Sequence, residues 1–177
     1  NGAGKSTLIK VIAGVHQPDE GSIQMDGKVT TFANPEASVD AGIATVYQDL
    51  ALCDNLDIVQ NMFLGRERYR QLLGLPLGRA TRVLDRKSMT ITAADLLADL
   101  RVTTVSDVRA KVASLSGGQR QSIAIARAVM GDSRIIILDE PTAALGVAQT
   151  YQVGELVKRL RDQGMGVILI SHDMNQV

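Results

Sequence analysis

Apolar residues at helical spacing mark several stretches of this chain of 177 residues. The pattern predicts amphipathic helices over residues 5–13, 91–100 and 149–163. A further helix is expected to begin after Ser116, because serine is a favoured N-cap residue. Gly14 and Gly164 directly follow the first and last of these stretches, where glycine commonly ends a helix.

Uninterrupted apolar runs predict strands that are buried on both faces of a sheet. Two such runs lie at residues 135–138 and 167–170, and a third strand is expected at 43–47. The strand–helix–strand order at the end of the chain requires parallel pairing, so the fold class is α/β with a parallel sheet. Residues 21–32 contain short strand-like stretches around an Asp26-Gly27 turn signal, which predicts an antiparallel β region.

Composition narrows the classes of protein to which the chain can belong. Apolar residues make up 45% and aromatic residues only 3%, so the core is expected to be aliphatic. The formal net charge of zero gives no support for broad nucleic-acid binding. No apolar run approaches the ~20 residues that span a bilayer. The one cysteine, Cys53, cannot form an internal disulfide, which fits a reducing compartment.

Basic residues are concentrated between residues 66 and 87. This stretch has Arg66, Arg68, Arg70, Arg79, Arg82, Arg86 and Lys87 against Glu67 and Asp85 only. Gly74, Pro76 and Gly78 interrupt it, so we interpret it as a solvated surface that contains a loop. Contact with acidic lipid headgroups is the alternative interpretation.

The first residues match the last part of the phosphate-binding pattern G-x-x-x-x-G-K-[ST]. They are Asn1, Gly2, Ala3, Gly4, Lys5, Ser6 and Thr7. Glycines let backbone N–H groups curl around phosphate oxygens, and the following helix adds the positive end of its dipole. We expect Lys5 to reach the β- and γ-phosphates and Ser6 to ligate Mg²⁺. Because the first glycine of the pattern is missing, we interpret the chain as a fragment that binds ATP poorly.

Two acidic residues end the apolar run at 135–138 and supply the second half of a nucleotide site. Asp139 would hold the magnesium ion, and Glu140 would polarise the attacking water. The carboxyl ends of strands in an open α/β sheet are where ligands bind. The alternative, that these acids merely end a strand before Pro141, is disfavoured once the phosphate-binding loop is considered with them.

The segment Leu115-Ser116-Gly117-Gly118-Gln119 forms a second candidate anion site, made of a hydroxyl and backbone N–H groups at a helix start. An ordinary N-cap followed by flexible glycines is the alternative. The segment lies between the phosphate-binding loop and the strand that ends in Asp-Glu-Pro. In sequence and in this position it resembles the signature motif of ABC-type ATPases. The resemblance implies that Ser116, Gly117, Gly118 and Gln119 bind the nucleotide of a partner cassette.

Further positions resemble this family in the expected order. Gln48 resembles the Q-loop glutamine, which contacts magnesium or its water, and His172 resembles the switch histidine beside the γ-phosphate. We therefore assign catalytic roles to Glu140, His172 and Gln48, and metal contacts to Ser6, Gln48 and Asp139. Ala143-Ala144-Leu145-Gly146 occupies the D-loop position, but Gly146 stands where the family often has aspartate, which puts that contact in doubt.

The resemblance also implies an architecture for the whole chain. It predicts one ABC ATP-binding domain over 1–177, truncated at both ends. This domain would be a P-loop NTPase core with a parallel sheet and an N-terminal antiparallel β region. A helical subdomain carrying the signature is expected at approximately 66–130.

Several short segments look most like ATP-binding subunits of ribose-, xylose- and fructose-type importers: residues 32–37, 41–43, 49–52, 61–67 and 140–146. The resemblance then implies ATP and Mg²⁺ as ligands and a second cassette as dimer partner. It also implies membrane permease subunits, an indirect link to a periplasmic sugar-binding protein, and a peripheral location on the cytoplasmic face of the inner membrane. Two alternatives remain: a soluble ABC ATPase that acts on translation or DNA, and a regulatory cassette that binds ATP without turnover.

Overall fold

The structure is a computed structural model that describes residues 4–71 and 82–171 of the chain. It divides into two compact units. Unit 1 comprises Asn1–Asp49 and Ala128–Val177, and unit 2 is the intervening Leu50–Arg127. Each unit buries apolar residues of its own, such as Ile137 in unit 1 and Phe63 in unit 2.

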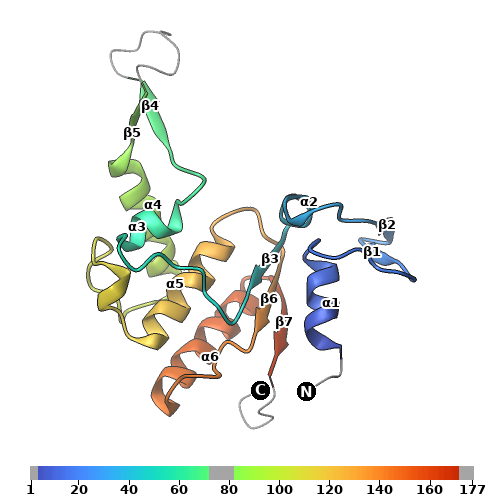
Figure 1. Cartoon of the computed structure of the whole chain (residues 1–177). Coiled ribbons are helices and arrows are strands. Elements are labelled where there is room, and N and C mark those ends of the chain that lie inside the picture. The colour runs from blue at the N-terminus through green and yellow to red at the C-terminus, as the bar shows by residue number, and fades with distance from the viewer. Residues whose placement is uncertain (1–3, 72–81, 172–177) are drawn as a thin grey trace. The chain divides into compact units, whose positions relative to one another are not determined.

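A three-stranded parallel sheet forms the centre of unit 1 (Figure 1). Its strands are β3 (Ile43–Val46), β6 (Ile135–Asp139) and β7 (Gly166–Ile170), in the order β3-β6-β7. Each strand lies within one residue of its predicted range, and both pairings are parallel, as predicted. The middle strand, β6, has three fully buried residues in succession, which explains its uninterrupted apolar sequence.

Helices lie on both sides of this sheet: α1 (Lys5–Ile12) on one side and α6 (Val147–Asp162) on the other (Figure 1). Ile9 of α1 packs into one core cluster with Ile43 and Ile137 of the sheet. Both helices match their predicted ranges closely. The expected apolar stripe of α1 is wrong at Leu8, which is 61% exposed. Leu8 points about 100° away from Ile9 around the helix, and only the Ile9 side faces the sheet.

Unit 1 also contains a β-hairpin and a short helix. Strands β1 (Ile23–Met25) and β2 (Lys28–Thr30) pair antiparallel, as predicted. Asp26 and Gly27 join them with φ angles of 52° and 74°, the left-handed pair that a two-residue type I′ turn requires. The helix α2 (Pro35–Asp40) was not predicted, because its six residues are too few to show a period. The Asn34 side chain caps it by accepting the Ala37 N–H at 2.9 Å.

Unit 2 is largely helical, with α3 (Ile58–Met62), α4 (Arg86–Asp99), a 3₁₀ turn (Val112–Ser114) and α5 (Gly117–Val129), whose last two residues belong to unit 1. The helix α5 begins directly after Ser116, as predicted. The helix α4 begins at Arg86 instead of residue 91. Asp85 caps it, since its carboxylate accepts the Ser88 N–H at 3.0 Å, and the polar first turn hid this start from a hydrophobic pattern.

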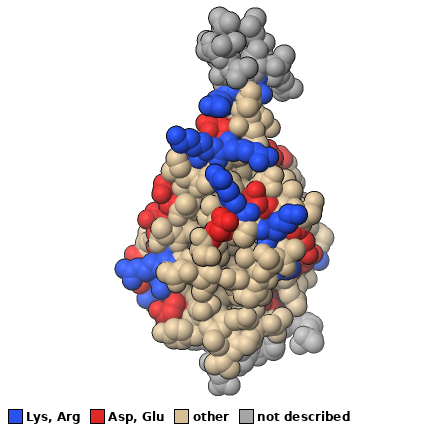
Figure 2. All heavy atoms as spheres, turned by 90° about the vertical axis from the view of Figure 1, so that its left-hand side faces the viewer, with Lys and Arg blue, Asp and Glu red and all other residues tan. Residues whose placement is uncertain are grey.

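The basic stretch contains two short strands that were not predicted. Strands β4 (Tyr69–Gln71) and β5 (Arg82–Leu84) pair antiparallel (Figure 1). The arginines of the described part are exposed, as expected, and Figure 2 shows Lys and Arg side chains gathered at the hairpin end of unit 2. Gly74, Pro76, Gly78 and Arg79 lie outside the described residues.

Candidate functional site: a nucleotide site at the sheet edge

Those predicted site residues of unit 1 that follow β3 and β6 and are described lie where the parallel strands end. Asp139 is the last residue of β6 and pairs with Ile170, the last residue of β7. Val46, which ends β3, pairs with Leu138, so Gln48 follows at the same edge two residues further on. Three segments that are far apart in the sequence therefore meet at the carboxyl edge of the sheet, where open α/β folds bind ligands.

Asp139 and Lys5 are close enough to interact electrostatically. Side chains alternate along a strand, so Asp139 shares the face of Ile137, which packs against α1. Lys5 opens α1. Burial and the carboxylate of Glu140 raise the pKa of Asp139, and the positive charge of Lys5 lowers it in part. The net effect is a raised pKa for Asp139. The repulsion between the two neighbouring carboxylates is therefore only partly offset by the positive charge of Lys5.

The first turn of α1 has the geometry of an anion-binding helix start. Gly4 is left-handed, with φ 73°, and a Cβ added there would meet nothing within 4 Å. Among the described residues, no side chain caps this helix start, and the N-cap itself is Gly4, which has no side chain to cap with. Lys5, Ser6 and Thr7 are exposed. Asn1, Gly2 and Ala3 lie outside the described residues.

Glu140 is held in a strained conformation directly after β6. Its φ of 52° is left-handed, which costs a residue other than glycine about 1–2 kcal/mol. Two backbone hydrogen bonds fix it: its N–H donates to the Ile170 carbonyl at 2.9 Å, and its carbonyl accepts the Ala143 N–H at 3.2 Å. Such strain concentrates at functional sites, because it aims a side chain where a relaxed backbone would not.

Gln48 and His172 are the other two residues predicted to be catalytic, and the structure describes only the first of them. Gln48 is exposed beyond β3. His172 lies outside the described residues, and Ser171 is the last residue before it. Sequence reasoning missed Tyr47, whose pKa is raised by burial and by the negative charge of Asp139. Alternation along the chain puts Tyr47 on the face of Ile43 and Thr45, but only the pairing of β3 with β6 shows that Asp139 shares that face.

The predicted signature lies in unit 2, and its side chains form a capping box. The Gln119 N–H donates to Ser116 Oγ at 3.3 Å, and the Ser116 N–H donates to Gln119 Oε1 at 2.8 Å. Gln119 Nε2 also donates to the Thr104 carbonyl. Ser116 and Gly117 are exposed, and Gly118 is buried. The turn is thus locally fixed, with one hydroxyl and the start of a helix turned to solvent.

The D-loop position connects β6 to α6. The Leu145 N–H donates to the Thr142 carbonyl at 3.1 Å, which closes a turn after Glu140. Gly146 is the N-cap of α6 and has no side chain to cap with; its own N–H donates to Gln149 Oε1 at 3.4 Å. The position that often carries aspartate in ABC ATPases therefore offers only backbone groups here.

Comparison with known families decides the assignment. The sequence profile described as "ABC transporter" matches residues 1–143. This chain belongs to the ABC transporter family. Crystal structures of ABC cassettes have the same fold: an ATP-binding cassette in its ADP conformation superimposes with a TM-score of 0.80 at 26% identity, covering 100% of this chain and 69% of that one.

Curated ABC relatives are named as sugar-import proteins. The fructose import ATP-binding protein FrcA of Rhizobium meliloti is 46% identical over 177 residues, which is all of this chain and 67% of the relative. The xylose/arabinose import protein XylG of Sulfolobus acidocaldarius is 43% identical over 99% of this chain and 66% of its own length. The arabinose import protein AraG of Chromohalobacter salexigens is 42% identical, and the chain spans only 33% of it.

Residues 4–71 and 82–171 contain neither a membrane-spanning helix nor a cluster of typical metal-binding side chains. No helix in these ranges is both long and apolar enough to cross a bilayer. Within the same ranges, no three His, Cys, Asp or Glu side chains gather as a metal site would require.

Proposed function

We propose that this chain is the ATP-binding and ATP-hydrolysing part of an ABC importer for a monosaccharide. The observation that carries the proposal is the electrostatic interaction of Lys5 with Asp139 at the strand end, beside a helix start whose N-cap is Gly4. A triphosphate needs this combination: backbone N–H donors, one lysine, and carboxylates for the metal and the attacking water.

The residues divide the chemistry of phosphoryl transfer among them. The N–H groups of residues 4–7 cradle the phosphates, and Lys5 neutralises the transferred group. Ser6, Asp139 and Gln48 would hold Mg²⁺, which when bound neutralises charge on the phosphate oxygens. Glu140 accepts a proton from the attacking water and orients it, from its position directly after β6.

His172 is assigned a contact to the γ-phosphate in this proposal. It directly follows Ser171, and β7 places Ile170 beside Asp139. The contact would let the strand end of β7 distinguish ATP from ADP. Gln48 would play the same part from β3, so each strand of the sheet ends in one group that responds to the γ-phosphate.

The signature is proposed to complete a second nucleotide site on a partner cassette. Ser116 Oγ and the backbone at Gly117 and Gly118 would contact the γ-phosphate held by the other copy, while Gln119 keeps this turn in shape through its capping bonds. A dimeric ABC cassette with ADP and Pi has a TM-score of 0.71 to this chain at 27% identity. Two ATP molecules would then join two cassettes, and hydrolysis would separate them.

Sugar import is proposed from the relatives, several of which are named for fructose, xylose, arabinose or ribose import. The partners would be a second cassette and membrane permease subunits, with a periplasmic sugar-binding protein linked indirectly. The location would be peripheral, at the cytoplasmic face of the inner membrane. No residue of this chain is proposed to contact the sugar.

A single substitution in the intact protein tests the proposal. Glu140→Gln keeps the shape of the side chain and removes its basic oxygen, so we expect ATP to bind and to hold two cassettes together without turnover. Size-exclusion chromatography with ATP and Mg²⁺ should show a dimer for this variant and release of phosphate only for the unmodified protein. An unmodified protein that binds ATP but never releases phosphate would instead indicate the regulatory cassette.

A further inference from the structure

The segment Leu50–Asp57, which follows Gln48 closely in the sequence, is bound along its whole length inside unit 2. Its backbone pairs with the residues that precede the signature. The Ala113 N–H donates to the Asp54 carbonyl at 3.1 Å, and the Val112 N–H donates to the Leu56 carbonyl at 3.0 Å. Asp57 forms an isolated antiparallel bridge with Lys111. The post-glutamine segment and the pre-signature segment are thus joined like two short strands.

Arg120, the first residue after the signature, joins three parts of this arrangement. Its guanidinium pairs with Asp54 at 3.0 Å and donates to the carbonyls of Ala113 at 3.2 Å and Leu115 at 3.3 Å. The two carbonyls belong to the backbone that leads into Ser116. One side chain therefore fixes the approach to the signature and attaches it to the post-glutamine segment.

Arg127 makes a second attachment on the same side of α5, two helical turns further along. It donates to the carbonyls of Leu50 at 2.8 Å and Ala51 at 2.7 Å. Ala51 has a φ of 48°, a left-handed conformation that costs free energy for alanine and that these hydrogen bonds help to hold. The two arginines thus hold the segment near its beginning and near Asp54.

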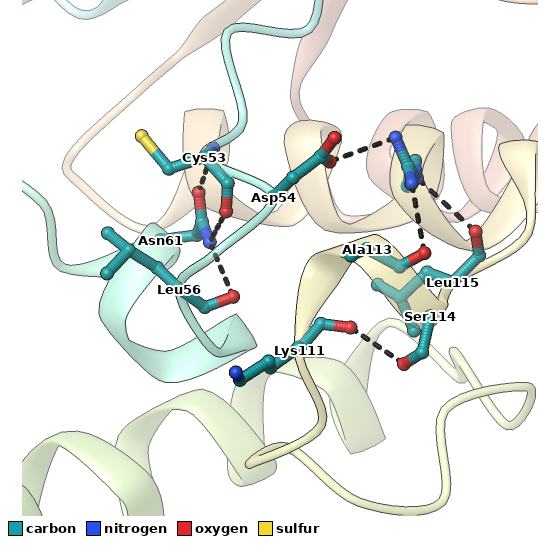
Figure 3. Close-up of polar contacts among 9 residues, drawn as sticks. Cys53, Asp54, Leu56, Asn61, Lys111, Ala113, Ser114 and Leu115 are labelled. Carbon is teal, nitrogen blue, oxygen red and sulfur yellow. Dashed lines mark hydrogen bonds and ion pairs between the residues drawn. The ribbon is translucent and has the colours of Figure 1, made fainter.

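Asn61 of α3 holds the middle of the segment and is itself fully buried. Its Oδ1 accepts the Cys53 N–H at 2.7 Å, and its Nδ2 donates to the Cys53 carbonyl at 3.0 Å (Figure 3). The same Nδ2 also donates to the Asp57 carbonyl at 3.0 Å. A buried amide with these partners is costly to displace, because separation would leave polar groups unpaired. Leu50–Asp57 consequently cannot move within unit 2 without moving its neighbours.

We propose that Arg120 and Asp54 are positioning residues for the proposed ATPase: their ion pair ties Leu50–Asp57 to the Ser116–Gln119 turn, so that a displacement of the segment re-aims the signature. This inference rests on the proposed function, because the turn is taken to meet a nucleotide. A purely structural pair would affect folding alone. A positioning pair must also change how the signature meets ATP, with little effect on the chemistry at Glu140.

The test compares two isosteric variants of the intact protein, Asp54→Asn and Asp26→Asn. Asp26 is a matched control, since it pairs with Arg134 at 2.9 Å in unit 1 and its side chain is 68% exposed against 62% for Asp54. Exposed ion pairs contribute little to stability, so both variants should fold. Asp54→Glu keeps the carboxylate and serves as the rescue variant, and Arg120→Gln removes the other partner.

Two measurements are made on each variant. Hydrogen exchange of the amides of residues 112–119 should accelerate about fivefold in Asp54→Asn and in Arg120→Gln, and stay unchanged in Asp26→Asn. In steady-state ATP hydrolysis, the same two variants should raise KM about fivefold with kcat within about twofold. Asp54→Glu should restore both quantities, and the double variant Asp54→Asn/Arg120→Gln should be no worse than either single one.

The outcomes separate this inference from the proposed function. Asp54→Asn behaving like Asp26→Asn in both measurements would overturn it, as would additive effects in the double variant. Faster exchange at residues 112–119 with unchanged kinetics would also overturn it, since the pair would then be structural only. If the unmodified protein hydrolyses no ATP, the proposed function fails, and unchanged hydrogen exchange in Asp54→Asn would independently reject the link to the signature.

Discussion

The two candidate phosphate-binding turns of this molecule are built in opposite ways. The sheet edge in unit 1 draws Lys5, Gln48 and Asp139 from three segments and places opposite charges together. The signature turn in unit 2 takes its form from neighbours in sequence, with Ser116 and Gln119 capping each other. The first depends on tertiary packing, whereas the internal form of the second depends on a local capping box, and only its attachment to Asp54 is tertiary. Their responses to substitution should therefore differ in kind.

The largest difference is expected for hydrolysis itself. Glu140→Gln should lower kcat at least about a hundredfold, because the group that accepts the water's proton is removed. Ser116→Ala should keep kcat within about tenfold and mainly raise KM, since the glycine backbone remains. Phosphate-release assays over a range of ATP concentrations would separate the two. Equal losses of kcat in the two variants would contradict the proposal that Glu140 acts in hydrolysis and Ser116 in nucleotide binding.

A substitution distant from both turns should affect only the sheet edge. Gly14 ends α1 with a φ of 72°, and a Cβ there would lie 2.3 Å from the Asn34 carbonyl oxygen. We expect Gly14→Ala to destabilise unit 1 by about 1–3 kcal/mol and to weaken ATP binding, because α1 must shift and Lys5 moves with it. Denaturant unfolding and nucleotide titration would measure this. Gly164→Ala is the control, since a Cβ at that left-handed glycine meets nothing within 4 Å.

Removing the Ser116 hydroxyl, which caps the helix α5, should lower the stability of the protein. Ser116→Ala is expected to destabilise the protein by about 1 kcal/mol, the usual worth of an N-cap. Ser116→Asp should recover most of that loss, because aspartate also caps helices, yet its charge should repel a phosphate. Thermal unfolding and ATP-driven dimerisation would test the two effects. Restored dimerisation in Ser116→Asp would mean that the turn does not meet a phosphate.

The smallest expected effect is a gain in stability. The pKa of Asp139 is raised in the folded state, so the folded protein holds that proton more tightly than the unfolded chain. Stability contributed by Asp139 is thus lost as pH rises through its raised pKa. Asp139→Asn should raise Tm by about 2 °C at neutral pH without nucleotide, and should leave Tm unchanged well below the normal carboxyl range. A lower Tm at neutral pH would contradict the crowding of carboxylates at this edge.

The same contrast explains how much could be predicted from the sequence. The parallel strands were predicted, since uninterrupted runs such as residues 135–138 carry their own signal. The helix start at Ser116 is equally local and was also found. The strands β4 and β5 and the short helix α3 were missed, because three to five residues are too few to show a period.

Tertiary features of the candidate site were beyond sequence reasoning. The positive φ of Glu140 arises from hydrogen bonds to Ile170 and Ala143, one of which is on another strand. The position of Tyr47 beside Asp139 and the ion pair of Arg120 with Asp54 likewise depend on how the chain folds back on itself. Motif order singled out Asp139 and Gln48, which follow neighbouring strands, but it could not give the contacts around them.

Calorimetric titration of ATP with Mg²⁺ into two lysine variants of the intact protein tests the convergence at the sheet edge most directly. Lys5 and Lys10 are both exposed on α1, in its first and last turns. Lys5→Ala should weaken ATP binding at least about a hundredfold, because the lysine that faces Asp139 is lost, while Lys10→Ala should bind as the unmodified protein does. Equal affinities for the two variants would show that the triphosphate does not bind at the start of α1.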